Sequence, residues 1–189
     1  FGAWIGSEYT SGSQRYTSDL KQAIYQWYHH WIFNGTAFTG ISLSAIPGSN
    51  VEISNNKISD GFIGVDVTAQ TNTVNNVRVH DNYITGFSSG AIYARGPLIN
   101  LQIYNNIMKD VNYAVRNHEL NLSESRKVYI YNNWVTNPDH IGMGIFFHYF
   151  SGTPIPSNPP EIYIYHNNFI GGRNGLNFDA YVGEYGGAK

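Results

Sequence analysis

The chain is built on a pattern that one segment shows in full, Val128-Tyr129-Ile130-Tyr131-Asn132-Asn133-Trp134-Val135. Hydrophobic residues alternate with tyrosines, two asparagines follow, and the chain then returns to hydrophobic residues. Alternation with period two is typical of a β-strand with one buried face. Asparagine tolerates the left-handed conformation of a tight bend. The segment therefore predicts a strand, a bend and a second strand.

The same pattern occurs four more times, at residues 51–58, 77–84, 101–108 and 162–169. The second asparagine of the five copies falls at Asn56, Asn82, Asn106, Asn133 and Asn167. By subtraction the steps are 26, 24, 27 and 34 residues. Repeats of about 20–50 residues indicate a stacked architecture. We expect these five asparagines at equivalent bends, with several in the left-handed region, and stacked amides that form ladders between coils.

A short strand that follows a small residue closes each repeat. These closing strands are predicted at residues 40–43, 64–67, 90–94, 114–117, 144–147 and 175–178. Each repeat thus holds two or three short strands with no room for a helix between them. This arrangement predicts a parallel β-helix, with the asparagine pairs in a structural role.

Over residues 38–179 the pattern resembles the right-handed parallel β-helix proteins of the pectate-lyase-like superfamily. The resemblance implies an all-β fold, a solenoid of about six coils. The superfamily contains mostly polysaccharide lyases and hydrolases, with some epimerases, phage tailspikes and adhesins. The resemblance therefore implies a carbohydrate-active or carbohydrate-binding protein.

The 189 residues predict one domain in three parts: an N-terminal loop and capping helix at 1–37, the β-helix at 38–180 and a glycine-rich tail at 181–189. The capping helix is predicted because Leu20, Ile24, Trp27 and Trp31 step by four, three and four residues after Ser18, a suitable N-cap. A helix there would cover the open end of the solenoid. The alternative is that residues 25–33 form another coil.

The composition excludes several function classes. Charged residues make up 13% of the chain, the net charge is -2, and no basic run suggests a nucleic-acid partner. No hydrophobic run approaches the length of a membrane span. Cysteine is absent, which excludes disulfides and thiol chemistry. A chain rich in Asn, Tyr, Gly, Ser and Thr and poor in Lys and Glu is expected to be secreted or on the cell surface, with a polysaccharide as its partner.

Aligning the closing strands places outward residues in two columns. The first column is Ser42, Asp66, Tyr93, Arg116, Phe146 and Asn177, and the second is Ser44, Thr68, Arg95, His118, His148 and Asp179. We call the surface of these two columns the closing-strand face. Coils lie about 4.8 Å apart and alternate residues about 6.6 Å apart, so residues distant in sequence converge here. The alternative is a solvated sheet face with unrelated polar residues.

The closing-strand face has the residue types that β-elimination of a uronic-acid glycan requires. Arg95 and Arg116 suit neutralisation of the sugar carboxylate, and His118, His148 and Tyr93 suit proton transfer. Asp66, Phe146, Asn177 and Asp179 are expected to contact the glycan. Hydrolysis needs two nearby carboxylates, whereas Asp66 and Asp179 are expected about 19 Å apart.

The segment Arg116-Asn117-His118-Glu119 resembles the Arg-His-Gly or Arg-Asn-His motif of polysaccharide lyase family 6, the chondroitinase B and alginate lyase group. The resemblance implies that Arg116 and His118 match the family's active-site Arg and His. Arg95 stands where a catalytic Lys would be sought. Ca²⁺ neutralises the carboxylate in some members, so Ca²⁺ is implied by the resemblance alone. The residues themselves indicate no metal or cofactor, because no cluster of Asp and Glu occurs.

A second surface carries Tyr104, Tyr131 and Tyr165 in one column of the preceding sheet. Aromatic faces stack on sugar rings, so this column is a candidate glycan platform. The alternatives are an aromatic ladder that stabilises the solenoid and a contact with another subunit. Three function classes remain open: a polysaccharide lyase, a non-catalytic glycan-binding module of the tailspike or adhesin type, and a structural solenoid that assembles as a homo-oligomer through its tyrosines.

Overall fold

The computed structural model describes residues 25–29, 32–34, 39–44, 50–69, 74–96, 98–118, 127–137, 143–149 and 161–180. The elements in these residues are all strands, and their pairings are all parallel. The expected loop at the N-terminus before residue 25 and the tail after residue 180 lie outside the described residues.

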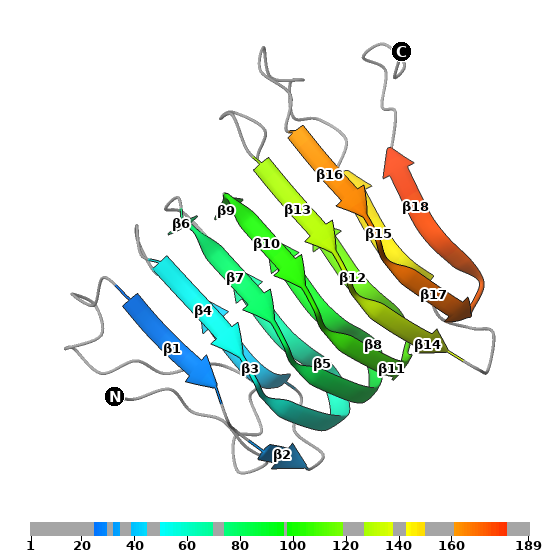
Figure 1. The fold of residues 1–189 in the computed structure, drawn as a ribbon, viewed down its shortest axis with the longest axis horizontal. Helices are drawn as coiled ribbons and strands as arrows, with labels where there is room; N and C mark the ends of the chain where they lie inside the picture. The colour runs from blue at the N-terminus through cyan, green and yellow to red at the C-terminus, as the bar shows by residue number, and fades with distance from the viewer. Residues whose placement is uncertain are drawn as a thin grey trace.

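One six-stranded sheet contains the first strand of each repeat, and its strands lie side by side in Figure 1. Its members in spatial order are β1 (Tyr25–His29), β4 (Asn50–Ser54), β7 (Val77–His80), β10 (Leu101–Tyr104), β13 (Lys127–Tyr131) and β16 (Glu161–Tyr165). Because consecutive members are separated by a whole repeat, the sheet runs along the axis of a solenoid.

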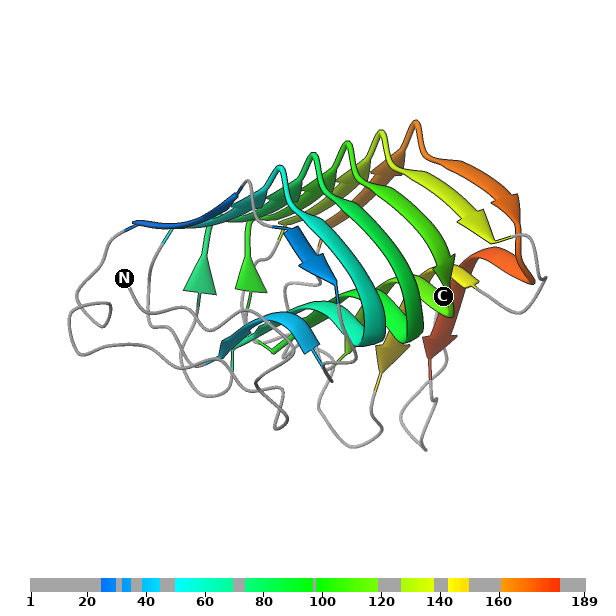
Figure 2. The same ribbon diagram turned by 90° about the horizontal axis from the view of Figure 1, so that it is seen from below.

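The ten-stranded sheet contains both later strands of each repeat, and Figure 2 shows it folding away from the first sheet at the bends. Its members are β2 (Ile32–Asn34), β3 (Thr39–Ser44), β5 (Lys57–Thr68), β8 (Tyr83–Arg95), β11 (Ile107–Val111), β12 (Tyr113–His118), β14 (Trp134–Asn137), β15 (Met143–Tyr149), β17 (Asn168–Gly171) and β18 (Asn174–Ala180). A two-stranded sheet pairs β6 (Val74–Asn75) with β9 (Leu98–Ile99).

Hydrophobic side chains fill the interior in columns. One column runs through the six-stranded sheet as Ile53, Val79, Ile103, Ile130 and Ile164, in the register that the repeats predict. The first four of these residues are fully buried. Each coil therefore buries its hydrophobic face against its neighbours, which is the source of stability in a solenoid.

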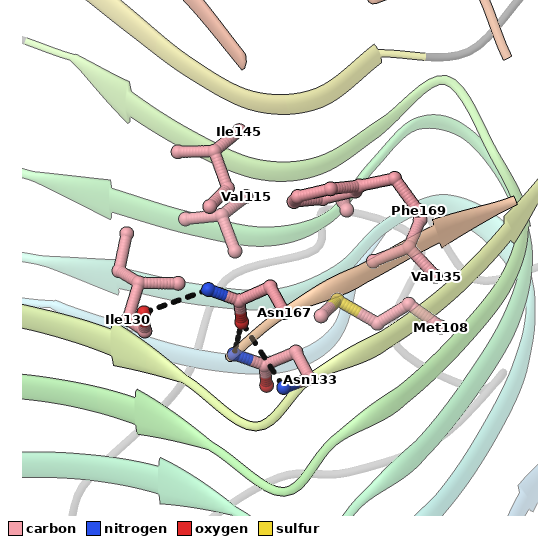
Figure 3. A pocket seen from close by; sticks show the side chains of 9 residues that line it. Met108, Val115, Ile130, Asn133, Val135, Ile145, Asn167 and Phe169 are labelled. Atoms are coloured by element: carbon pink, nitrogen blue, oxygen red, sulfur yellow. Dashed lines mark hydrogen bonds between the residues drawn. The ribbon is translucent and has the colours of Figure 1, made fainter. Parts of the chain in front are cut away.

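The interior is tightly packed where β13 and β16 meet the closing strands. Met108, Val115, Ile145 and Phe169 point toward one another in Figure 3, beside the asparagine ladder. The space between them does not admit a water-sized sphere. This part of the solenoid is a core and is too full to hold a ligand.

The five repeated asparagines occupy the bends but not the conformation that the repeats predicted. The left-handed residue is the one before each of them, namely Asn55, Asp81, Asn105, Asn132 and His166, with φ between 53° and 58°. The second asparagine instead turns its side chain inward and joins a ladder of hydrogen bonds. The prediction of left-handed conformations at Asn56, Asn82, Asn106, Asn133 and Asn167 is wrong, because the left-handed residue in each pair faces outward.

The predicted capping helix is also wrong where the structure can be compared with it. Tyr25–His29 is strand β1, which pairs with β4, and β2 pairs with β5. The alternative of another coil is correct for these residues, because their aromatic side chains hid a strand pattern. Residues 17–24 lie outside the described ranges. Among the described residues, no helical segment has the length and hydrophobicity that a membrane crossing needs.

Candidate functional site

The register of the closing strands agrees with both predicted columns. In the first column Asp66 pairs with Tyr93 and Tyr93 with Arg116, and in the second Thr68 pairs with Arg95 and Arg95 with His118. The columns continue to Phe146 and Asn177 and to His148 and Asp179. Inward residues on the same strands, such as Ile92 and Val115, are fully buried. The fold therefore brings the predicted positions into register on neighbouring closing strands, from places 23 or more residues apart in the sequence.

Arg95 forms an ion pair with Asp66 across neighbouring strands. Arg95 Nη2 lies 2.5 Å from Asp66 Oδ2, and Thr68 Oγ1 donates to the other carboxylate oxygen at 2.7 Å. The Asp66 side chain is only 12% exposed, whereas 36% of the Arg95 side chain is accessible. The guanidinium therefore covers the carboxylate. The columns alone did not predict this pair, because it runs diagonally from the first column to the second.

Arg116 is held by a buried phenol. Its Nη1 donates to the hydroxyl oxygen of Tyr93 at 2.6 Å, and Ser89 makes a short hydrogen bond to the same oxygen. The Arg116 guanidinium also lies 5.0 Å from the ring centroid of Tyr113 and 5.2 Å from that of Tyr93. Cation–π contacts of this kind fix an arginine as well as attract it. Tyr93 is 5% exposed, so the guanidinium group of Arg116 packs on a buried ring.

The two arginines share the ring of Tyr93. Arg95 Cζ lies 5.7 Å from its centroid, and Arg116 Cζ lies 5.2 Å from it. Both arginine residues are partly exposed, although the Nε atom of each is buried, and each has a hydrogen-bonded anchor, Asp66 for Arg95 and Tyr93 for Arg116. The result is a pair of fixed cations on the outer surface of a rigid sheet, which is suited to binding carboxylate groups.

Two histidines occupy the strands next to this pair. His118 on β12 is in register with Arg95, and His148 on β15 is in register with His118. Parallel neighbours are about 4.8 Å apart, so both histidine positions lie within about 10 Å of Arg95 along the sheet. Asn117, between Arg116 and His118, points inward and is 1% exposed. Asn117 of the Arg-Asn-His segment therefore does not belong to the outer face.

The two aspartate positions in these columns are too far apart to form a hydrolytic pair. Asp66 is on β5 and Asp179 is on β18, with β8, β12 and β15 between them. Four strand spacings are about 19 Å, well beyond the roughly 5–9.5 Å that glycoside hydrolysis uses. Glu119 lies outside the described residues.

The column of aromatic residues on the six-stranded sheet is a stacked ladder. His80, Tyr104, Tyr131 and Tyr165 follow one another with ring centroids 4.5, 4.9 and 5.0 Å apart and interplanar angles of 2–6°. Both faces of Tyr104 and of Tyr131 therefore lie against neighbouring rings. The last ring, Tyr165, is 44% exposed. The role of these tyrosines in glycan binding stays a prediction, and the stacking of both faces of Tyr104 and Tyr131 weighs against these two rings as a sugar platform.

The ladder raises the pKa of its inner tyrosines. Burial is the main cause of the raised pKa of Tyr104, and the neighbouring Tyr131 adds to it. Burial likewise raises the pKa of Tyr131, with a further contribution from Tyr165. Stacked phenols resist ionisation because a phenolate would lose solvation and face its neighbour's partial charge.

Metal ligands do not converge within the ranges that the structure describes: no group of three His, Cys, Asp or Glu side chains there has the geometry to hold a metal ion. The ring nitrogens of His80, for example, are each directed at a carboxylate in an ion-pair contact, Nε2 at Glu52 and Nδ1 at Asp81. The described part of the closing-strand face therefore gives no support for the Ca²⁺ that the family resemblance implied.

Sequence reasoning missed the residues that hold the arginines. Ser89 and Tyr113 precede the closing strands and stand outside both columns, and Thr68 was in a column but without a role. The sequence held one signal. Ser89 and Tyr113 each come directly before the small residue that starts a predicted closing strand, and therefore close to the outward positions of that strand. Their contacts with Tyr93 and Arg116 depend on side-chain direction, which strand alternation does not give.

Comparison with known proteins supports the fold and leaves the activity open. Residues 24–183 match the family model described as "Right handed beta helix region". Neither the comparison with curated proteins nor that with solved structures finds a match. The match covers most of the 189 residues and agrees with the parallel solenoid of three sheets. The chain therefore belongs to the family of proteins with a right-handed parallel β-helix.

Proposed function

We propose that this protein is a carbohydrate-active β-helix protein that binds a uronic-acid glycan on the closing-strand face and cleaves it by β-elimination. The observation that carries the proposal is the pair of guanidinium groups over Tyr93, with the Arg116–Tyr93 bond of 2.6 Å and the Arg95–Asp66 bond of 2.5 Å. A fixed arginine suits a uronate carboxylate, because its planar fork matches two carboxylate oxygens.

The reaction needs a base for the proton on C5 of the sugar. A neutral histidine fulfils this role near neutral pH, and His118 is the closest histidine position to Arg95 in the register. Removal of the C5 proton forms the double bond between C4 and C5, and the C4–O bond breaks. The departing oxygen takes up a proton, for which His148 on the next strand is the proposed donor.

The placement of the two aspartates, Asp66 and Asp179, favours elimination over hydrolysis. Asp66 is bonded through both of its oxygens, to Thr68 and to Arg95, and is covered by them. Asp179 is four strands away in the register. A glycosidase needs one protonated and one ionised carboxyl group on either side of the same bond, and these two residues do not meet that need.

The test uses four uronate polymers: polygalacturonate, alginate, hyaluronan and chondroitin sulfate. Elimination leaves an unsaturated sugar whose ultraviolet absorbance reports turnover. His118→Ala is expected to lower kcat by about 10²–10⁴-fold, the usual contribution of a general base. His166→Asn is the matched control, because His166 lies at a bend of the other sheet in a left-handed conformation that Asn accepts. Unchanged turnover in His118→Ala would refute the assignment.

A non-catalytic glycan-binding module is the second candidate. It is favoured by the burial of Tyr93, which leaves that phenol without access to a sugar proton. In this case the wild-type protein would retain a uronate polymer in affinity electrophoresis without releasing any unsaturated product. Binding without product would therefore replace the lyase proposal with this one.

A further inference from the structure

The two arginines of the closing-strand face are anchored by residues that solvent scarcely reaches. Asp66 is 8% exposed and Tyr93 is 5% exposed. A side chain covered to this extent has little surface to offer a polysaccharide. Its hydrogen bonds instead go to Arg95 and Arg116, which are both partly accessible. Asp66 and Tyr93 are thus placed to hold the two arginines, whereas Arg95 and Arg116 are placed to contact a ligand.

Each anchor is itself fixed by a hydroxyl group. Thr68 donates to Asp66 Oδ1 at 2.7 Å, and Ser89 is hydrogen-bonded to the hydroxyl of Tyr93. Two chains result, one from Thr68 through Asp66 to Arg95 and one from Ser89 through Tyr93 to Arg116. Both chains end on a guanidinium group over the same aromatic ring, at 5.7 and 5.2 Å from its centroid.

We propose that Asp66 and Tyr93 are positioning residues, Asp66 for Arg95 and Tyr93 for Arg116. An arginine that is already held loses little conformational entropy when a ligand binds, because folding has restricted it beforehand. The ring of Tyr93 sets the placement of both guanidinium groups, so the face presents a fixed two-point pattern to successive acidic groups. The identity of the ligand rests on the proposed function, whereas the positioning itself does not.

The positioning is tested without any glycan, by NMR of the protein labelled with ¹⁵N-arginine. In Asp66→Asn, exchange of the Arg95 guanidinium hydrogens with solvent is expected to become about tenfold faster, since a charge-assisted bond is lost. The Arg116 signals should keep their exchange rate. Tyr93→Phe is expected to show the reverse pattern, with faster exchange at Arg116. A purely structural role would instead speed exchange at both arginines together.

Two further variants protect the test against loss of the fold. Thr68→Val keeps the Asp66 carboxylate and removes only its second bond, and it should speed Arg95 exchange less than Asp66→Asn does. Asp110→Asn is the matched control. Asp110 is an exposed carboxylate on β11, beside Lys109, whereas Asp66 is on β5. Substitution of Asp110 should leave both arginines unchanged. Equal exchange rates at Arg95 in wild type and Asp66→Asn would overturn the proposal.

Binding of polygalacturonate then tests the consequence for the site. If the wild type binds it, Asp66→Asn and Tyr93→Phe are each expected to raise the Kd about tenfold, with Asp110→Asn unchanged. Full affinity in a variant whose arginine has been freed would overturn the link between positioning and binding. If the wild type binds none of the four polymers, the proposed function fails, and the arginine exchange rates still decide whether Asp66 and Tyr93 position the arginines.

Discussion

Asn133 satisfies two donors of Asn106 with a single oxygen. Its Oδ1 accepts the side-chain Nδ2–H of Asn106 at 3.0 Å and the main-chain N–H of Asn106 at 3.1 Å. Asn106 offers the same two bonds to Asn82, at 3.0 and 3.1 Å. Each rung of the ladder therefore joins one coil to the next through both the side chain and the main chain, inside a core where an unpaired amide is costly.

Replacement of Asn106 by Val is expected to reduce the free energy of unfolding by about 3 kcal/mol or more, because several buried groups lose their partners at about 1–3 kcal/mol each. Asn106 is fully buried and also donates to the carbonyls of Val79 and Tyr104. The measurement is denaturant unfolding, with Thr85→Val on an outward strand position as the control. A loss no larger than that of the control would contradict the ladder's role.

Asn105 should respond in the opposite way to substitution. It is exposed and has φ of 54°, so Asn105→Gly is expected to change the free energy of unfolding by no more than about 0.5 kcal/mol. Asn105→Val should lose about 1–3 kcal/mol through left-handed strain. Denaturant unfolding of Asn105→Gly and Asn106→Gly gives the direct comparison. Equal losses of unfolding free energy in these two variants would contradict the different roles assigned to Asn105 and Asn106.

Alkaline pH is expected to destabilise the solenoid through its stacked tyrosines. Burial raises the pKa of Tyr104 and Tyr131 above the ordinary value of about 10, so the folded state favours the protonated phenols. Their contribution is therefore fully present below pH of about 10 and is lost as the pH rises through the folded-state pKa values.

The double variant Tyr104→Phe/Tyr131→Phe removes these two titrating groups. Its free energy of unfolding should decline less between neutral and strongly alkaline pH than that of the wild type. Denaturant unfolding over a series of pH values measures this, and ultraviolet titration of the phenols checks the pKa directions directly. Identical alkaline declines in both proteins would count against the ladder as the origin.

Arg116→Lys keeps the positive charge but loses the planar fork that contacts Tyr93 and Tyr113. Affinity for the uronate polymer that the wild type binds is expected to fall by about tenfold, because bidentate recognition and ring stacking are both lost. Affinity electrophoresis over a range of salt concentrations provides the measurement. Arg173→Lys, at the exposed bend between β17 and β18, is the matched control, and an equal effect in both variants would indicate a nonspecific charge effect.

The repeats predicted the strands and their register because a solenoid repeats its contacts as well as its sequence. They also held the signal that separates the two asparagine positions. The first position is Asn, Asp, Asn, Asn and His in successive copies, whereas the second is always Asn. A left-handed bend accepts all three residue types, but a ladder needs a donor and an acceptor on one short side chain. The prediction treated the pair as one feature and therefore assigned the wrong member.

The site was harder to predict than the fold. Register identifies which residues are neighbours along a column, and it correctly grouped Tyr93 with Arg116. It does not show that a long side chain such as Arg95 reaches diagonally to Asp66. The N-terminal strand was only the alternative to a capping helix for a different reason, since the spacing of Trp27 and Trp31 fits one face of a helix and the many aromatic residues of this segment concealed the alternation.

The geometry of the amide ladder does not depend on how many residues separate one coil from the next. The side-chain bond between Asn82 and Asn106 spans 24 residues and measures 3.0 Å, while that between Asn133 and Asn167 spans 34 residues and measures 2.9 Å. Ten additional residues therefore leave the rung unchanged. In evolution, a segment between coils can lengthen, shorten or be exchanged while the asparagines keep the coils in register, so new binding specificity can arise without a new fold.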